Sequence, residues 1–144
     1  MLLNVETDPR DHSSCALSYN EAEGWIEATW RGYVDAAEAM RGAEAYLRYA
    51  APQPCSFLFN NNRELRGPWF DSLDWLLHVW VPQADRLGLR YVAHLVQADQ
   101  HSDLFTDSSP QSLPFELQLF KDIDDARAWL RAMRQDATAP GHQG

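Results

Sequence analysis

The 144-residue chain contains little cysteine and no long apolar run. Cys15 and Cys55 are its only cysteines, which is too few for a disulfide framework or a cysteine-rich zinc site. Its apolar runs are only a few residues long, whereas a helix that spans a bilayer needs about 20 apolar residues. Asn4 and Glu6 interrupt the apolar start of the chain, unlike a secretory signal peptide. We therefore expect a cytoplasmic protein with reduced thiols.

Positive charge is also scarce. Twelve Lys and Arg residues stand against 21 Asp and Glu residues, for a net charge of −9, and Lys121 is the single lysine. No stretch clusters the basic residues, as binding to a phosphate backbone or to an anionic lipid surface requires. We therefore expect neither a nucleic-acid partner nor a membrane partner. The 45% apolar and 23% charged residues match an ordinary folded chain of single-domain size.

The first half of the chain predicts strands followed by one helix and another strand. Aromatic and β-branched residues indicate short strands at 2–6, 15–19 and 25–30. Asp35 and Glu38 form the sequence pattern of a capping box, which predicts a helix from there to residue 50. The apolar run 55–59 then predicts a buried strand, and the polar stretch 60–68 that follows predicts a loop.

The second half predicts two more helices and two more strands. Apolar spacing indicates a helix over 73–87, with a kink near 79–81 caused by Pro82 and a left-handed end at Gly88. Strands are predicted at 91–96 and 115–120, with a loop at 97–114 between them, and a helix begins near Asp122. The resulting order, β-β-β-α-β-α-β-β-α, predicts one α/β domain over residues 1–136. We expect a mixed sheet flanked by helices and a disordered tail at 137–144.

The sequence contains no motif typical of catalysis. It has no nucleophile elbow, phosphate-binding loop, dinucleotide fingerprint or helical zinc pair, so we assign no catalytic residue, metal ligand or cofactor. Asp99, His101 and Asp103 have the spacing of a possible metal loop, but such composition is common in ordinary loops. His94, inside a predicted strand, is better interpreted as a packed or hydrogen-bonded histidine. Cys55 is better interpreted as an inert core cysteine.

The segment 60–69 is the strongest candidate for a binding site. It follows the carboxyl end of a buried strand, where open α/β sheets usually bind ligands. Its amides, guanidinium groups and indole suit a polar or anionic partner. The alternative is that the asparagines cap a turn while the tryptophan covers the edge of the core. The candidate residues are Asn60, Asn61, Asn62, Arg63, Arg66 and Trp69, together with Trp75, which with Val79 could form a second core layer or a dimer patch.

Several short stretches together resemble the STAS-like superfamily, whose best-known members are the anti-sigma-factor antagonists of sporulation. They span about residues 25–131 and are Trp30-Arg31-Gly32, Leu58 to Arg63, Gly67-Pro68-Trp69, Trp75, Trp80-Val81-Pro82, Gly88-Leu89-Arg90, Ala93, Phe120-Lys121-Asp122, Ala126 and Trp129-Leu130. The resemblance implies a mixed sheet flanked by helices and a small bacterial branch of unknown function. It also implies a non-enzymatic module that binds proteins, small ligands or nucleotides.

The resemblance does not extend to the phosphorylation switch of the antagonists. Their phosphorylatable serine starts the helix after the central strand, whereas this chain has Asn60 to Arg63 there and no hydroxyl until Ser72. Two hypotheses follow. The first is a non-enzymatic regulatory module that docks a protein partner or a second copy of itself through 60–69 and the next helix. The alternative is a small-molecule-binding protein or minor enzyme with a pocket at that loop, using His94 or Asp71.

Overall fold

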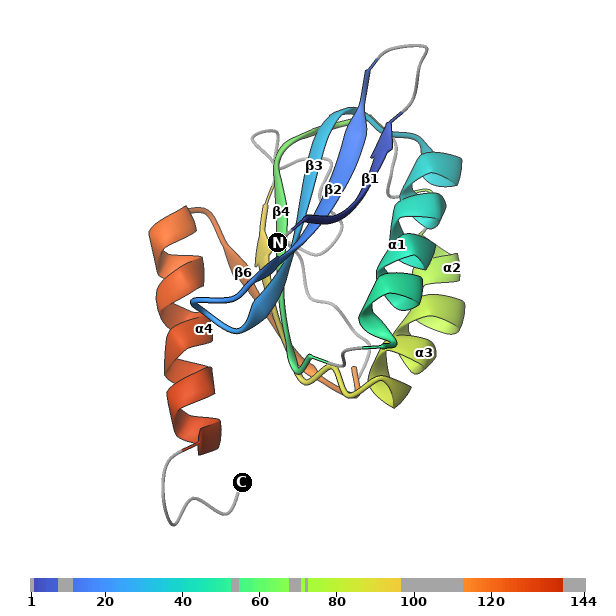
Figure 1. The fold of residues 1–144 in the computed structure, drawn as a ribbon. Helices are drawn as coiled ribbons and strands as arrows, with labels where there is room; N and C mark the ends of the chain where they lie inside the picture. The colour runs from blue at the N-terminus through green and yellow to red at the C-terminus, as the bar shows by residue number, and fades with distance from the viewer. Residues whose placement is uncertain are drawn as a thin grey trace.

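The computed structural model describes residues 2–7, 12–52, 55–67, 71, 73–96 and 113–138, which form one six-stranded sheet with helices on both faces (Figure 1). The elements are β1 (Leu2–Thr7), β2 (Ser14–Asn20), β3 (Trp25–Tyr33), α1 (Ala36–Ala50), β4 (Phe57–Arg66), α2 (Leu73–Trp75), the π-helix η2 (Leu76–Trp80), α3 (Val81–Arg86), β5 (Tyr91–Leu95), β6 (Glu116–Phe120) and α4 (Ile123–Thr138). This order confirms the predicted α/β fold, with α2, η2 and α3 together forming the second helix.

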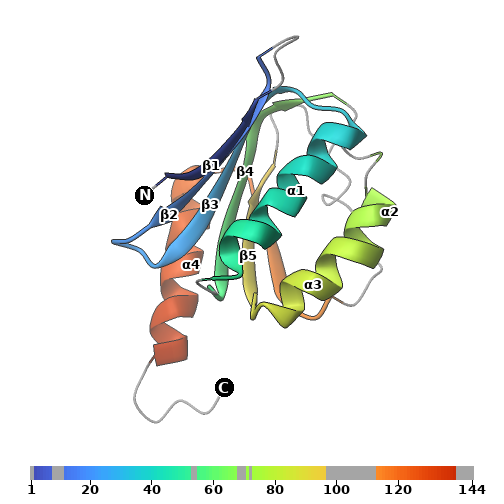
Figure 2. The same cartoon turned by 45° about the vertical axis from the view of Figure 1, so that its right-hand side comes forward.

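The sheet is mixed, and its strands lie in chain order from β1 to β6. The pairs β1–β2 and β2–β3 are antiparallel, whereas β3–β4, β4–β5 and β5–β6 are parallel. The chain moves in one direction across the parallel part, so crossovers of the usual hand leave successive helices on one face. Accordingly, α1 and the α2–η2–α3 segment lie side by side on one face, and α4 covers the other (Figure 2).

The alternation of side chains along the strands divides the core into two layers. Leu58 of β4 and Val92 of β5 face the layer under α1 and α3. Phe59 and Ala93, their neighbours in the chain, face α4 and pack with its buried Leu130. Both central strands are therefore buried on both faces, as the apolar runs at 55–59 and 91–96 predict.

The predicted loop at 60–68 is wrong for residues 60–66, because β4 continues to Arg66. Asparagine is depleted in strands and favours turns, so local propensity alone indicates a loop. The nine-residue strand β3 overrides this preference by offering ladder partners as far as Tyr33, which pairs with Arg66. The register shifts between Thr29 and Arg31, a β-bulge that places Leu65 on the α1 face.

The second helix breaks where Pro82 predicts a kink. Because proline has no N–H to donate, the regular α-helical ladder cannot continue through this position. The turn before it is π-helical, and the Val81 N–H donates to the Leu76 carbonyl five residues earlier. After α3, Gly88 has φ of +97°, the left-handed conformation expected at a helix end.

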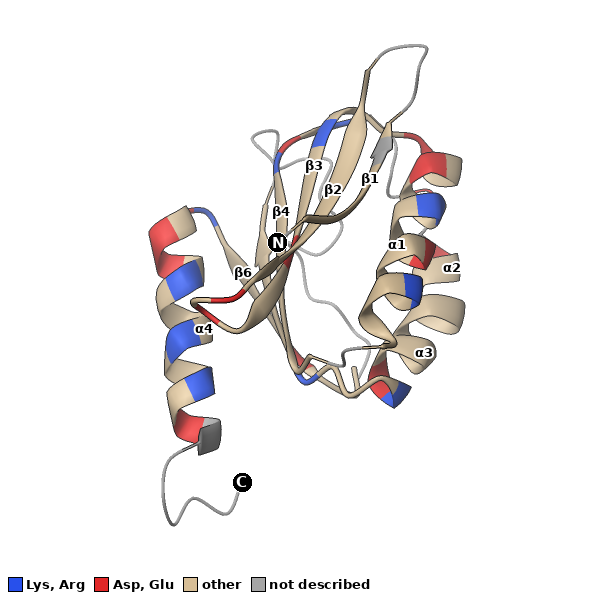
Figure 3. Ribbon diagram, in the orientation of Figure 1, with Lys and Arg blue, Asp and Glu red and all other residues tan. Residues whose placement is uncertain are grey.

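The two long helices begin with side-chain caps. Asp35 and Glu38 form the predicted capping box at the start of α1. At the start of α4, Asp122 accepts hydrogen bonds from the backbone N–H groups of Asp124 and Asp125 (2.7 and 3.3 Å). The acidic first turn of α4 suits the helix dipole, whereas the arginines lie in the middle of the helix and its last turn has no basic residue (Figure 3). The helix ends at Thr138, two residues into the expected tail, whereas residues 139–144 lie outside the described part.

Candidate functional site

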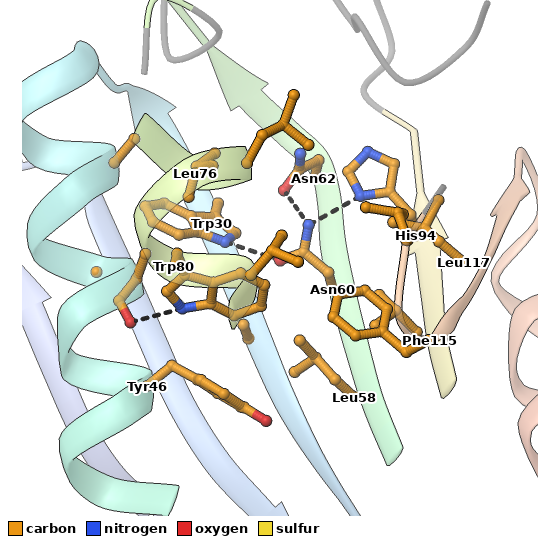
Figure 4. A pocket seen from close by; sticks show the side chains of 18 of the residues that line it. Trp30, Tyr46, Leu58, Asn60, Asn62, Leu76, Trp80, His94, Phe115 and Leu117 are labelled. Carbon is orange, nitrogen blue, oxygen red and sulfur yellow. Dashed lines mark hydrogen bonds between the residues drawn. The ribbon is translucent and has the colours of Figure 1, made fainter. Parts of the chain in front are cut away.

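A cavity of about 110 Å³ lies between the sheet and the helices that cover its α1 face (Figure 4). The sheet forms the floor, α1 one wall and the η2–α3 segment the other. None of the described lining residues is charged. The lining residues are Leu17, Ala28, Trp30, Ala39, Gly42, Ala43, Tyr46, Leu58, Asn60, Asn62, Leu65, Leu76, Leu77, Trp80, Val81, Val92, His94, Leu113, Phe115 and Leu117.

An aromatic cluster closes part of the cavity wall. The Trp80 indole N–H donates to the Ala43 carbonyl at 3.0 Å and so joins η2 to α1. Its ring centroid lies 5.4 Å from that of Tyr46 and 6.5 Å from that of Phe115. Burial raises the pKa of Tyr46, so its phenol stays protonated and neutral beside the cavity. The wall is therefore aromatic and uncharged.

Polar side chains meet at one place in this apolar surface. The Trp30 indole N–H donates to Asn60 Oδ1 at 3.0 Å. Asn60 Nδ2 donates to Asn62 Oδ1 at 3.2 Å and lies 2.9 Å from Nδ1 of His94. The three strands β3, β4 and β5 bring these residues together, because Asn60 pairs with Ala28 on one side and with His94 on the other. Figure 4 shows Asn60 at the centre of this group.

The predicted binding residues divide between two sides of β4. Asn60 and Asn62 line the cavity, whereas the side-chain oxygen of Asn61 accepts from the Arg63 N–H at 3.0 Å. Arg63 and Arg66 are exposed. The asparagine run is therefore part of the sheet, and its alternate residues have different surroundings.

The remaining candidates lie elsewhere. Trp69 lies outside the described residues, and Trp75 is half-buried and is not among the residues that line the cavity. Asp71 is exposed and does not line it either. Val79, which could form a dimer patch, is 39% exposed.

Sequence reasoning missed Trp30, Tyr46 and Trp80 as cavity residues. Nothing in the local pattern distinguishes them from ordinary core aromatics. His94 is 2% exposed and hydrogen-bonded, which confirms its interpretation as a packed histidine. The sequence feature that could have indicated this site is the presence of two polar residues, Asn60 and His94, at strand positions flanked by buried apolar residues.

The described residues contain no group of three His, Cys, Asp or Glu side chains that could hold a metal ion. The possible metal loop at Asp99, His101 and Asp103 lies outside them. Burial raises the pKa of the Cys55 thiol, as the interpretation of an unreactive cysteine requires. Among the described residues, no helix has the length and hydropathy to cross a bilayer.

Comparison with solved structures assigns the fold. The chain has a SpoIIAA-like fold, which is the STAS-like architecture expected from the sequence. The matching structure is an uncharacterised protein of the DUF3478 family from Shewanella loihica PV-4, described as having a SpoIIAA-like fold. The match covers 87% of this chain and 98% of that chain, with 16% sequence identity and a TM-score of 0.53. In sequence, the chain matches no family model and no curated protein. The comparison thus establishes the fold and leaves the function to be argued from the site.

Proposed function

We propose that this protein binds a small, largely apolar molecule in the cavity between the sheet and helices α1 and α3. The observation that carries this proposal is an apolar cavity with a few polar groups gathered at one place, the usual form of a ligand site. A ligand that fills this space would gain dispersion contacts with the apolar lining and remove apolar surface from water.

The size and charge of the cavity limit the ligand. An apolar cavity of about 150 Å³ holds benzene, so about 110 Å³ suits a molecule with roughly one six-membered ring. A charged group would lose its hydration there without gaining an opposite charge from any described lining residue. The proposal is therefore for a neutral ligand.

The experiment is a titration of the protein with cyclohexanone and, separately, with the hydrocarbon methylenecyclohexane, followed by amide chemical shifts in NMR. Val81 is half-buried and lines the cavity, so Val81→Phe fills part of it. We expect Val81→Phe to weaken binding at least about tenfold, since the new ring occupies the ligand volume.

Val79→Phe is the matched control, because Val79 lies on the same helical segment but does not line the cavity. It should bind like the wild type. Unfolding curves of both variants establish that each is folded. The proposal is wrong if neither compound binds, or if Val81→Phe and the wild type bind equally well.

The docking of a protein partner or of a second copy, the first hypothesis from the sequence, stays a prediction. Arg63 and Arg66 are exposed near the end of β4, and Arg31 pairs with Glu64 there at 3.8 Å. These residues are accessible to a partner, but no described contact indicates its chemistry. The cavity provides the more specific argument, because both its shape and its lining restrict what it can bind.

A further inference from the structure

The hydrogen bonds at the polar end of the cavity have a direction that Trp30 determines. An indole nitrogen only donates, so the Asn60 atom that Trp30 contacts must be the oxygen. The other end of the Asn60 amide is then the NH₂ group, which only donates. The orientation of this amide, often ambiguous in a structure, is therefore decided by its chemistry.

The orientation of the Asn60 amide also determines which atoms its two other neighbours must present to it. Asn62 must present its oxygen to Asn60 Nδ2, and His94 must present an unprotonated Nδ1. The neutral His94 ring then carries its proton on Nε2. In Figure 4, the Asn62 nitrogen and the second ring nitrogen of His94 point to the same side of Asn60.

Asn62 is the member of this group that is placed to bind a ligand. It is 2% exposed and lines the cavity. Within the described part of the chain, its side chain makes a single hydrogen bond, in which Oδ1 accepts from Asn60 Nδ2. No fully buried side-chain nitrogen or oxygen of the described residues lacks a partner, so Nδ2 keeps some accessible surface. Its N–H groups are therefore accessible to a molecule in the cavity.

We infer that the cavity selects a neutral ligand with a hydrogen-bond acceptor, such as a ketone or amide carbonyl, which accepts from Asn62 Nδ2. This inference rests on the proposed function and specifies its ligand class. A ligand with only donor groups would leave the Asn62 N–H groups unsatisfied, which is costly in an apolar site. A carboxylate would accept the hydrogen bond but would bring a charge that no described lining residue compensates.

The test compares three probes of similar size: cyclohexanone, methylenecyclohexane and cyclohexanecarboxylate. The ketone and the hydrocarbon differ only in an oxygen against a CH₂ group. Water hydrates the ketone more strongly than the hydrocarbon, so the wild-type ratio of affinities combines this cost with the gain from Asn62. The part due to Asn62 should be about five- to tenfold, the effect of one hydrogen bond. The carboxylate should bind most weakly at neutral pH.

Asn62→Leu removes the donor and keeps a side chain of similar size. We expect it to lower the ketone-to-hydrocarbon ratio of affinities about five- to tenfold, by weakening ketone binding alone. Asn61→Leu is the matched control, because Asn61 is the adjacent residue of β4 and does not line the cavity. That variant should keep the wild-type ratio.

A measurement on the unmodified protein keeps the inference testable if Asn62→Leu does not fold. The side-chain NH₂ resonances of Asn62 should shift downfield with cyclohexanone and not with methylenecyclohexane. If the bound ketone leaves these resonances unshifted, or if Asn62→Leu leaves the ratio of affinities unchanged, the inference is overturned while the proposed function stays intact. A lower ketone-to-hydrocarbon ratio of affinities in Tyr46→Phe but not in Asn62→Leu would also overturn the inference, because the tyrosine hydroxyl would then be the donor. Absence of binding by every probe would refute the proposed function itself.

Discussion

Replacing Gly42 with alanine tests how closely α1 packs on the sheet. In the middle of a helix, alanine is about 1 kcal/mol more favourable than glycine, so propensity alone predicts a more stable protein. The structure predicts the opposite. A Cβ atom at position 42 would lie 3.0 Å from Trp30 Cζ3 and 3.1 Å from Cζ2, and closer still to Cη2. The methyl group therefore enters the space that the indole occupies.

The size of the effect follows from what Trp30 must give up. Adding a methyl group to a packed core typically costs about 1–3 kcal/mol. If the indole moves, its hydrogen bond to Asn60 weakens as well, with a further loss of about 1 kcal/mol. After the gain of about 1 kcal/mol in helix propensity, we expect Gly42→Ala to lower the free energy of unfolding by about 1–3 kcal/mol.

The assay is urea unfolding of Gly42→Ala in two backgrounds, the wild type and Trp30→Leu. Without the indole, the clash is removed and the propensity gain of about 1 kcal/mol should emerge as a stabilisation. The sign of the substitution thus reverses between the backgrounds, with a coupling energy of about 2–4 kcal/mol. Stabilisation of the wild type by Gly42→Ala, or the same destabilisation in both backgrounds, would refute the reasoning.

Two further predictions concern α1. Asp35→Ala should lower the free energy of unfolding by about 1 kcal/mol, because the Asp35 carboxylate accepts from the Glu38 N–H at 2.9 Å; Asp35→Asn, an equally good cap, should not. Equal losses in the two variants, measured by urea unfolding, would mean that the cap is not the cause. Burial raises the pKa of Tyr46, so the folded state holds the phenolic proton more tightly than the unfolded state, in which the pKa is near 10.0. This contribution to stability is complete below pH 10 and decreases as the pH rises above it, by at most about 1.4 kcal/mol per pH unit. Unfolding curves above pH 10 should therefore show a smaller decline for Tyr46→Phe than for the wild type, and identical declines would contradict the assignment.

Much of the fold was predictable because local signals and the final structure agree. The capping box at Asp35, the break before Pro82 and the left-handed end at Gly88 depend on a few adjacent residues. The acidic start of α4 and the alternation in β6 are equally local. Because each signal indicates the same order of strands and helices as the folded chain, the α/β class follows from the sequence.

The asparagine run shows where local reasoning stopped. Asn60 and Asn61 have side chains that favour turns, and strand pairing is the better choice for their backbone only because β3 and β5 lie on either side of them. The β-bulge after Thr29 then changes which later residues face α1, a shift that strict alternation along β4 does not predict.

By itself, the sequence determined the order of the elements, the caps, the helix break and the central strands, because these depend on neighbours in the chain. Only the tertiary structure decided the site. Trp30, Asn60 and His94 come from three strands, and their hydrogen bonds exist only once parallel pairing aligns those strands. The cavity likewise needs α1 and α3 to pack beside each other on one face of the sheet, which is a consequence of the crossovers and of no single segment.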